Sequence, residues 1–67
     1  MREKSDIEIV MGFLSDEVEG VEMYTKEIAM VKHPEAKALF KTILVDKKKH
    51  AHALLQLFNK LAQSALT

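Results

Sequence analysis

The chain has 67 residues, with ten Lys and Arg, ten Asp and Glu, and no Cys. The absence of cysteine excludes disulfides, thiolate metal sites and thiol chemistry. A formal net charge of zero gives no electrostatic reason to expect a nucleic acid or a membrane as partner. The charged amino terminus and the lack of an apolar run of ~18 residues favour a cytoplasmic protein.

The zero net charge conceals two opposed halves. Residues 1–31 hold eight acidic and three basic residues, whereas residues 32–67 hold two acidic and seven basic ones. The balance is therefore −5 in the first half and +5 in the second. We expect the acidic and basic segments to lie side by side, although each exposed ion pair contributes only ~0–1 kcal/mol.

The chain 1–67 is predicted to form one all-α domain of two helices joined by a turn. Ser5 and Glu8 match a capping box, in which each side chain satisfies an amide of the other residue, so the first helix is predicted over about 6–31. The turn is predicted over 32–34, with Pro34 suited to the start of a second helix over about 35–65. Because the connection is short, the two helices are expected to run antiparallel.

Each predicted helix carries a stripe of mostly apolar residues at alternating steps of three and four. The stripe of the first helix is Ile7, Val10, Leu14, Glu17, Val21, Tyr24, Ile28 and Val31. The stripe of the second helix is Ala36, Phe40, Ile43, Lys47, His50, Leu54, Leu57 and Leu61. Further apolar residues widen both stripes beyond what one neighbouring helix covers, and a core this small rarely contributes more than ~3–5 kcal/mol alone. We therefore predict a homodimer, and on the same grounds allow a higher oligomer, in which two hairpins form a four-helix bundle.

Three ionisable residues interrupt these stripes, namely Glu17, Lys47 and His50. Counted outward from the turn, they fall at one level, about halfway along the hairpin, which we call the polar level. A buried ionisable group costs several kcal/mol unless it is paired or bound to a metal ion. Clustering of three such residues therefore marks the polar level as the candidate functional site.

The segments 17–24 (EVEGVEMY), 33–40 (HPEAKALF) and 44–51 (LVDKKKHA) together resemble one helical hairpin of rubrerythrin-type di-iron proteins, in the ferritin-like superfamily. The resemblance extends over roughly residues 7–61. Domains of that family contain two such hairpins, and two Glu residues with two Glu-x-x-His motifs bind two iron ions in the resulting bundle. The resemblance implies that this chain is half of such a domain and that two copies restore it.

Residue by residue, the resemblance places Glu17 on a carboxylate ligand, His50 on the imidazole ligand and Tyr24 on the tyrosine of the first helix. It implies iron or another divalent metal bound at the dimer core through Glu17 and His50. Lys47 stands where the family has the glutamate of Glu-x-x-His, so the site is degenerate. An enzyme built on it would be a di-iron-type oxidoreductase, and without cysteine it would need an external electron donor.

The alternative is a metal-free helical dimerisation or scaffold module. In this reading Glu17–Lys47 ion pairs replace the metal, because the two ammonium groups of a dimer stand where cationic charge is needed. Such buried pairs specify register more than they stabilise. Asp46, four residues before His50, and Tyr24 are expected beside the polar level in either reading.

The sequence also predicts the positions of two histidines and two glycines. His33 is predicted at the entry to the second helix, and His52 is predicted to face solvent. Gly20 lies near Glu17 and is expected to permit close approach of a helix or access to the site. Gly12 is predicted to face outward and to cost the helix ~1 kcal/mol.

Overall fold

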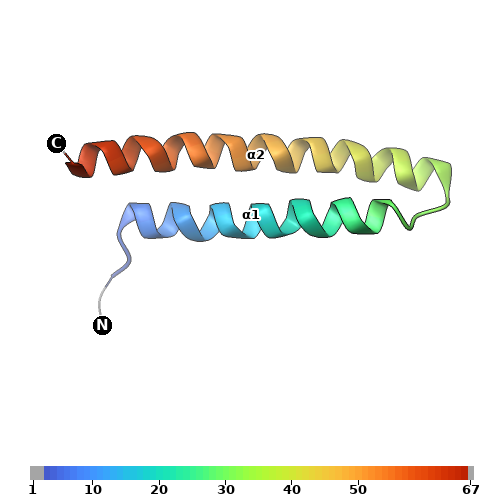
Figure 1. The fold of residues 1–67 in the computed structure, drawn as a ribbon, viewed down its shortest axis with the longest axis horizontal. Coiled ribbons are helices and arrows are strands. Elements are labelled where there is room, and N and C mark those ends of the chain that lie inside the picture. The colour runs from blue at the N-terminus through green and yellow to red at the C-terminus, as the bar shows by residue number, and fades with distance from the viewer. Residues whose placement is uncertain (1–2, 67) are drawn as a thin grey trace.

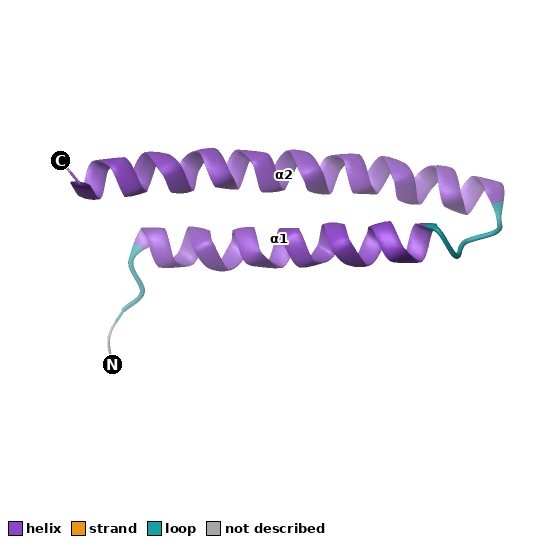
Figure 2. Ribbon diagram, in the orientation of Figure 1, coloured by secondary structure: helices purple, strands orange, loops and turns teal. Residues whose placement is uncertain are grey.

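The computed structural model describes residues 3–66, with side chains through residue 64. Within that range the chain forms two helices and no strands, α1 over Asp6–Ile28 and α2 over Pro34–Leu66. Figures 1 and 2 show them antiparallel and side by side, joined by one loop. The predicted all-α hairpin is thus confirmed, whereas its pairing into a four-helix bundle stays a prediction.

The start of α1 follows from the chemistry of Ser5. This residue is the N-cap, with extended backbone angles of φ −71° and ψ 162°. Its hydroxyl accepts a hydrogen bond from the Glu8 amide at 3.4 Å and donates one to the Glu8 carboxylate at 3.2 Å. The acidic side chains of Asp6 and Glu8 in the first turn also oppose the positive end of the helix dipole. The helix therefore begins at Asp6, as the sequence predicts.

The connection between the helices is longer than predicted. Helix α1 ends at Ile28, three residues before Val31, and tight i to i+3 hydrogen bonds follow, from the Met30 amide to the Glu27 carbonyl at 2.9 Å and from Val31 to Ile28 at 3.3 Å. Residue 33 precedes a proline, and a following proline disfavours helical backbone. The chain therefore reverses direction over residues 29–33, although the periodicity of the sequence assigns residues 29–31 to the first helix.

Helix α2 begins at Pro34 with His33 as its cap. The His33 imidazole Nδ1 accepts from the Ala36 amide at 3.3 Å, and its carbonyl accepts from the Lys37 amide at 2.9 Å. The imidazole thus satisfies an amide of the first turn that has no backbone partner, and the His33 carbonyl accepts the first regular hydrogen bond of the helix. His33 thus takes a structural role at the helix entry, where the sequence places it.

The two helices meet along the predicted stripe of α1, but along a modified stripe of α2. All predicted stripe residues of α1 are partly or fully buried, and Val10 and Ile28 are buried most completely, at 8% and 7% exposure. In α2, Ala51 and Phe58 turn inward, whereas the predicted His50 and Leu57 lie exposed on the flank. This difference has a geometric cause. An α-helix has 3.6 residues per turn, so the buried stripe advances by four residues at some places where the predicted stripe advances by three.

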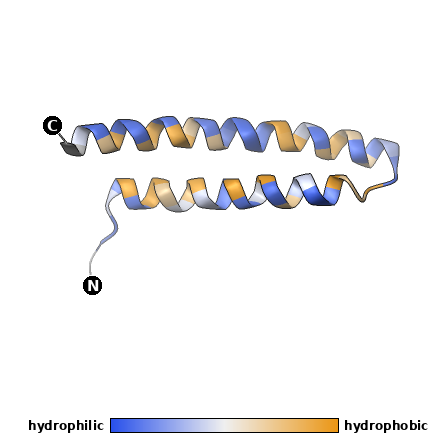
Figure 3. Cartoon of the chain, viewed as in Figure 1, coloured by the Kyte–Doolittle hydropathy of each residue, from blue (hydrophilic) through white to orange (hydrophobic). Residues whose placement is uncertain are grey.

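The hairpin is a single layer of helices, 50 × 26 × 13 Å in extent. Its thickness is about one helix diameter with side chains, ~10–12 Å. The layer therefore has two broad faces, which no other part of the described chain covers, and two edges formed by the outer sides of α1 and α2. Figure 3 shows hydrophobic residues recurring along both helices and a hydrophilic stretch near the middle of α2.

Ten large apolar side chains of the described residues are exposed to solvent. Their exposed fractions run from 43% for Ile9 to 71% for Met30, and Phe13 and Leu39 are 58% and 57% exposed. Soluble monomers rarely leave so much apolar surface in water. No helix in the described residues is long and apolar enough to cross a membrane. The cytoplasmic location expected from the sequence stays a prediction.

Gly12 offers a direct test of helix stability in this layer. A Cβ built at Gly12 meets no atom within 4 Å. We expect Gly12→Ala to raise the free energy of unfolding by about 0.5–1 kcal/mol through helix propensity alone, as measured by urea denaturation followed by circular dichroism. Loss of stability instead would mean that another chain packs against Gly12 in the assembled protein.

Candidate functional site

The structure brings Glu17 and His50 together across the two helices. Glu17 projects from the buried stripe of α1, and His50 from the flank of α2. The His50 Nδ1 atom lies 3.9 Å from the Glu17 Oε1 atom. The Glu17 side chain is 26% exposed and the His50 side chain 64% exposed. The Glu17 carboxylate therefore lies mostly buried in the helix interface, whereas the His50 imidazole is exposed to solvent.

The second oxygen of Glu17 has no hydrogen-bond partner among the residues that the structure describes. The Oε2 atom is buried and makes no hydrogen bond within the described residues. A buried carboxylate oxygen without a donor is costly, and native structures usually satisfy such an atom with a side chain, a water or an ion. The Glu17 Oε2 atom is therefore a buried polar atom at this level that has no donor among the described residues.

Lys47 also lies at the polar level, but its ammonium group turns to an aromatic ring. The Lys47 Nζ atom lies 5.1 Å from the centroid of the Tyr24 ring, within the range of a cation–π contact. Tyr24 in turn meets Phe40 edge to face, with the centroids 6.4 Å apart and an interplanar angle of 81°. This aromatic pair spans both helices and fixes the ring on which the ammonium rests.

Within the described chain, the Glu17 carboxylate lies 3.9 Å from the His50 imidazole and forms no ion pair with Lys47. The predicted Glu17–Lys47 pair is therefore not part of a single hairpin, and between two copies it stays a prediction. The Lys47 side chain runs past Gly20 instead: a Cβ at Gly20 would lie 3.4 Å from Nζ and 3.6 Å from Cδ. The absence of a side chain at Gly20 leaves room on this side of the hairpin.

These contacts define one broad face, which we call the open face. Lys47 reaches Gly20 and His50 reaches Glu17, so both side chains cross the helix interface on the same side. Helical periodicity places Phe13, two turns before Gly20, and Leu57, two turns after His50, on that side as well. The open face therefore combines the polar level with the exposed apolar residues Phe13 and Leu57, which are 58% and 44% exposed.

The remaining predicted residues lie outside this cluster. Asp46 and His52 are exposed on α2. Among the residues that the structure describes, no three His, Cys, Asp or Glu side chains gather closely enough to hold a metal ion. A single hairpin thus brings one carboxylate and one imidazole together at the polar level.

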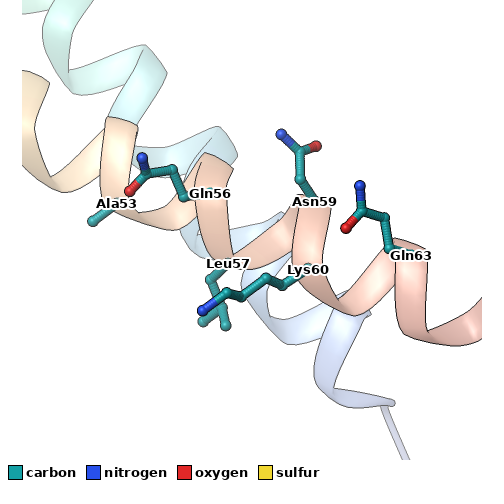
Figure 4. Close-up of a pocket in the computed structure, with 6 residues that line it drawn as sticks. All are labelled: Ala53, Gln56, Leu57, Asn59, Lys60 and Gln63. Carbon is teal, nitrogen blue, oxygen red and sulfur yellow. The ribbon is translucent and has the colours of Figure 1, made fainter.

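A shallow groove of about 490 Å³ lies on α2 beyond the polar level, shown in Figure 4. All of its lining residues belong to α2, so it follows one helix and is not a cleft between the two. It holds no carboxylate and no imidazole, and apart from Lys60 its polar groups are amides. The lining residues are Ala53, Gln56, Leu57, Asn59, Lys60 and Gln63. Sequence periodicity did not single out this groove, because its polar residues are typical of an exposed helix surface.

No family model, no curated protein and no solved structure matches this chain. Conclusions about function therefore rest on the residues and their geometry.

Proposed function

We propose that this chain forms a homodimeric, ferritin-like four-helix bundle that binds one divalent metal ion between its two copies, through Glu17 and His50. The observation that carries the proposal is the Glu17 carboxylate, which has a buried and unpartnered Oε2 atom and lies 3.9 Å from an imidazole. A metal ion would satisfy that oxygen, and carboxylate oxygen with imidazole nitrogen is a common ligand combination for zinc and ferrous ions.

The number of ligands argues for one metal ion in the dimer. Two copies supply two Glu17 carboxylates and two His50 imidazoles, which complete a four-coordinate site. The two carboxylates also balance the charge of one divalent ion. A di-iron site of the family that the sequence resembles would need two further carboxylates, and Lys47 occupies the positions from which they would come. The aromatic contact of Lys47 keeps its ammonium group stabilised without the use of Glu17.

The second candidate function is a metal-free dimerisation module. Lys47 favours this function, because it is a half-buried cation at the polar level. A second copy that packs on the open face would bring its own Glu17 to the same level as this Lys47. In that arrangement the carboxylate oxygen that lacks a donor in one hairpin would accept from the partner's Lys47. Such pairing would fix the register of the dimer at the polar level.

Metal analysis separates the two functions. The untagged protein, purified without chelator, is loaded anaerobically with ferrous or zinc ions and dialysed, and its metal content is measured per chain. We expect about half an equivalent per chain, and a loss of most of it in Glu17→Gln and in His50→Ala. The matched controls are Glu19→Gln and His52→Ala, two residues further along each helix, and these variants should keep the metal content of the parent.

Less than about a tenth of an equivalent in the loaded parent protein would reject metal binding at physiological affinity and leave the dimerisation module. Equal metal content in Glu17→Gln and Glu19→Gln would show that bound metal sits elsewhere. Light scattering of the same samples gives the oligomeric state, so failure of the dimer and failure of the metal site are read separately.

A further inference from the structure

The two edges of the helical layer carry opposite charge. In α1, residues 16–27 contain five acidic residues and one lysine. Helix α2 (Pro34–Leu66) contains six lysines and two acidic residues, Glu35 and Asp46. Helical periodicity places much of this charge on the outer edges, away from the partner helix. The acidic edge is Asp16, Glu19, Glu22, Met23, Lys26 and Glu27, with four acidic residues and one lysine, and the basic edge is Lys41, Val45, Lys48, Lys49 and His52, all exposed.

Each edge has an exposed apolar residue among its charges. Met23 is 58% exposed on the acidic edge, and Val45 is 51% exposed on the basic edge. Val45 lines a shallow groove of about 390 Å³ on α2. Lys48, Lys49 and His52 surround the apolar part of that groove. A flexible methionine within acidic surroundings thus complements an apolar groove within basic surroundings.

The register of the hairpin puts the two edges at the same height. Glu17 lies opposite His50, and Gly20 lies opposite Lys47. A step of three residues toward the C-terminus of α1 therefore matches a step of three residues toward the N-terminus of α2. By the same register, Glu19 is level with position 48, and Met23 is within one residue of the level of Val45. A second hairpin placed beside the first, by a sideways shift alone, therefore brings acidic residues opposite lysines and Met23 opposite the groove at Val45.

We propose that a second copy of this chain docks edge to edge, with the acidic edge of α1 against the basic edge of α2. Such a contact joins two different surfaces and leaves one edge free at each end, so it repeats from copy to copy. It uses the edges of the layer, whereas the proposed dimer uses the open face, and the two contacts are compatible. The result is an assembly larger than a dimer, held at its edges by complementary charge.

Ionic strength controls this contact. One exposed ion pair contributes only ~0–1 kcal/mol, so the edge contact depends on several pairs acting together and on the burial of Met23 and Val45. Added salt screens these pairs, because the Debye length falls from roughly 20 Å at about 0.02 M to roughly 4 Å at about 0.5 M. We expect the mean mass from light scattering to exceed the high-salt value at least about twofold at low salt.

Charge reversal tests the pairing of the edges. The variant Lys48→Glu/Lys49→Glu carries two acidic edges, and Glu19→Lys/Glu22→Lys carries two basic edges. Each variant alone should keep its high-salt mass at low salt, while an equimolar mixture should regain the large species. The control Lys4→Glu/Lys32→Glu makes the same change in net charge outside both edges and should still assemble like the parent. Met23→Ser should shift assembly to lower salt.

Three outcomes would overturn the proposal. These outcomes are one mass of the parent protein at all salt concentrations, loss of assembly in the control as complete as in the α2 variant, and a mixture that remains dissociated. None of these outcomes bears on metal binding or on the high-salt oligomer, so the proposed function is tested independently.

Discussion

Replacing Phe13 or Leu57 with glutamate is expected to abolish the proposed homodimer and to unfold the hairpin. Both side chains lie on the open face, 58% and 44% exposed in a single chain. Burial of a large apolar side chain contributes ~1.5–3 kcal/mol, and a two-fold dimer buries each of them twice. Phe13→Glu should therefore weaken dimerisation by about 3–6 kcal/mol, or roughly a hundredfold to ten-thousandfold in Kd. Sedimentation at micromolar concentration and far-ultraviolet circular dichroism measure both effects.

Met23→Glu is the matched control for Phe13→Glu. Met23 has the same exposed fraction, 58%, on the same helix, but it lies on the acidic edge and not on the open face. At about 0.5 M salt, where edge contacts are screened, Met23→Glu should keep the dimer and its helicity. Equal losses in the two variants would mean that the open face has no special role. A stable, folded monomer of the parent protein would contradict the dimer itself.

Local chemistry made much of the fold predictable. The Ser5 cap and Pro34 fix the two helix starts because each acts through its immediate neighbours. The stripe of α1 also agrees with the structure, since its steps of three and four follow the facing side of a helix closely. The pairing of Glu17 with His50 follows from counting outward from the turn, because the loop fixes which residues of the two helices lie level.

The rest depended on contacts between the helices. The sequence pattern does not distinguish His50 and Leu57 from Ala51 and Phe58 as inward residues, because both sets continue a pattern of threes and fours. Packing of the two helices selects the second set. The end of α1 is set by the space that the chain needs to reverse direction before Pro34. The contact of Lys47 with Tyr24 depends on side-chain conformation, which periodicity does not describe.

If the proposed metal site is correct, Lys47→Glu is expected to raise metal binding from one to two ions per dimer. The change would give each chain two carboxylates and one imidazole at the polar level, and two copies would then supply four carboxylates and two imidazoles, the ligand set of ferritin-like di-iron sites. Four carboxylates balance the charge of two ferrous ions. The measurement is ferrous stoichiometry after anaerobic loading, with near-ultraviolet absorbance after exposure to air. In the absence of metal the variant should be less stable than the parent, because it loses a cation–π contact of ~0.5–2 kcal/mol and gathers negative charge.

Two controls show whether charge or ligand number decides the gain. Lys48→Glu changes the charge equally, but its side chain lies on the basic edge, so its metal content should stay that of the parent. Lys47→Met removes the ammonium group without adding a ligand. If repulsion by Lys47 alone limits the site, Lys47→Met should bind one ion per dimer more tightly and never two. An unchanged stoichiometry in Lys47→Glu would show that the positions of Glu17 and His50 in the dimer differ from those of the family. Lysine at position 47 would then be a consequence of a lost metal site and not its cause.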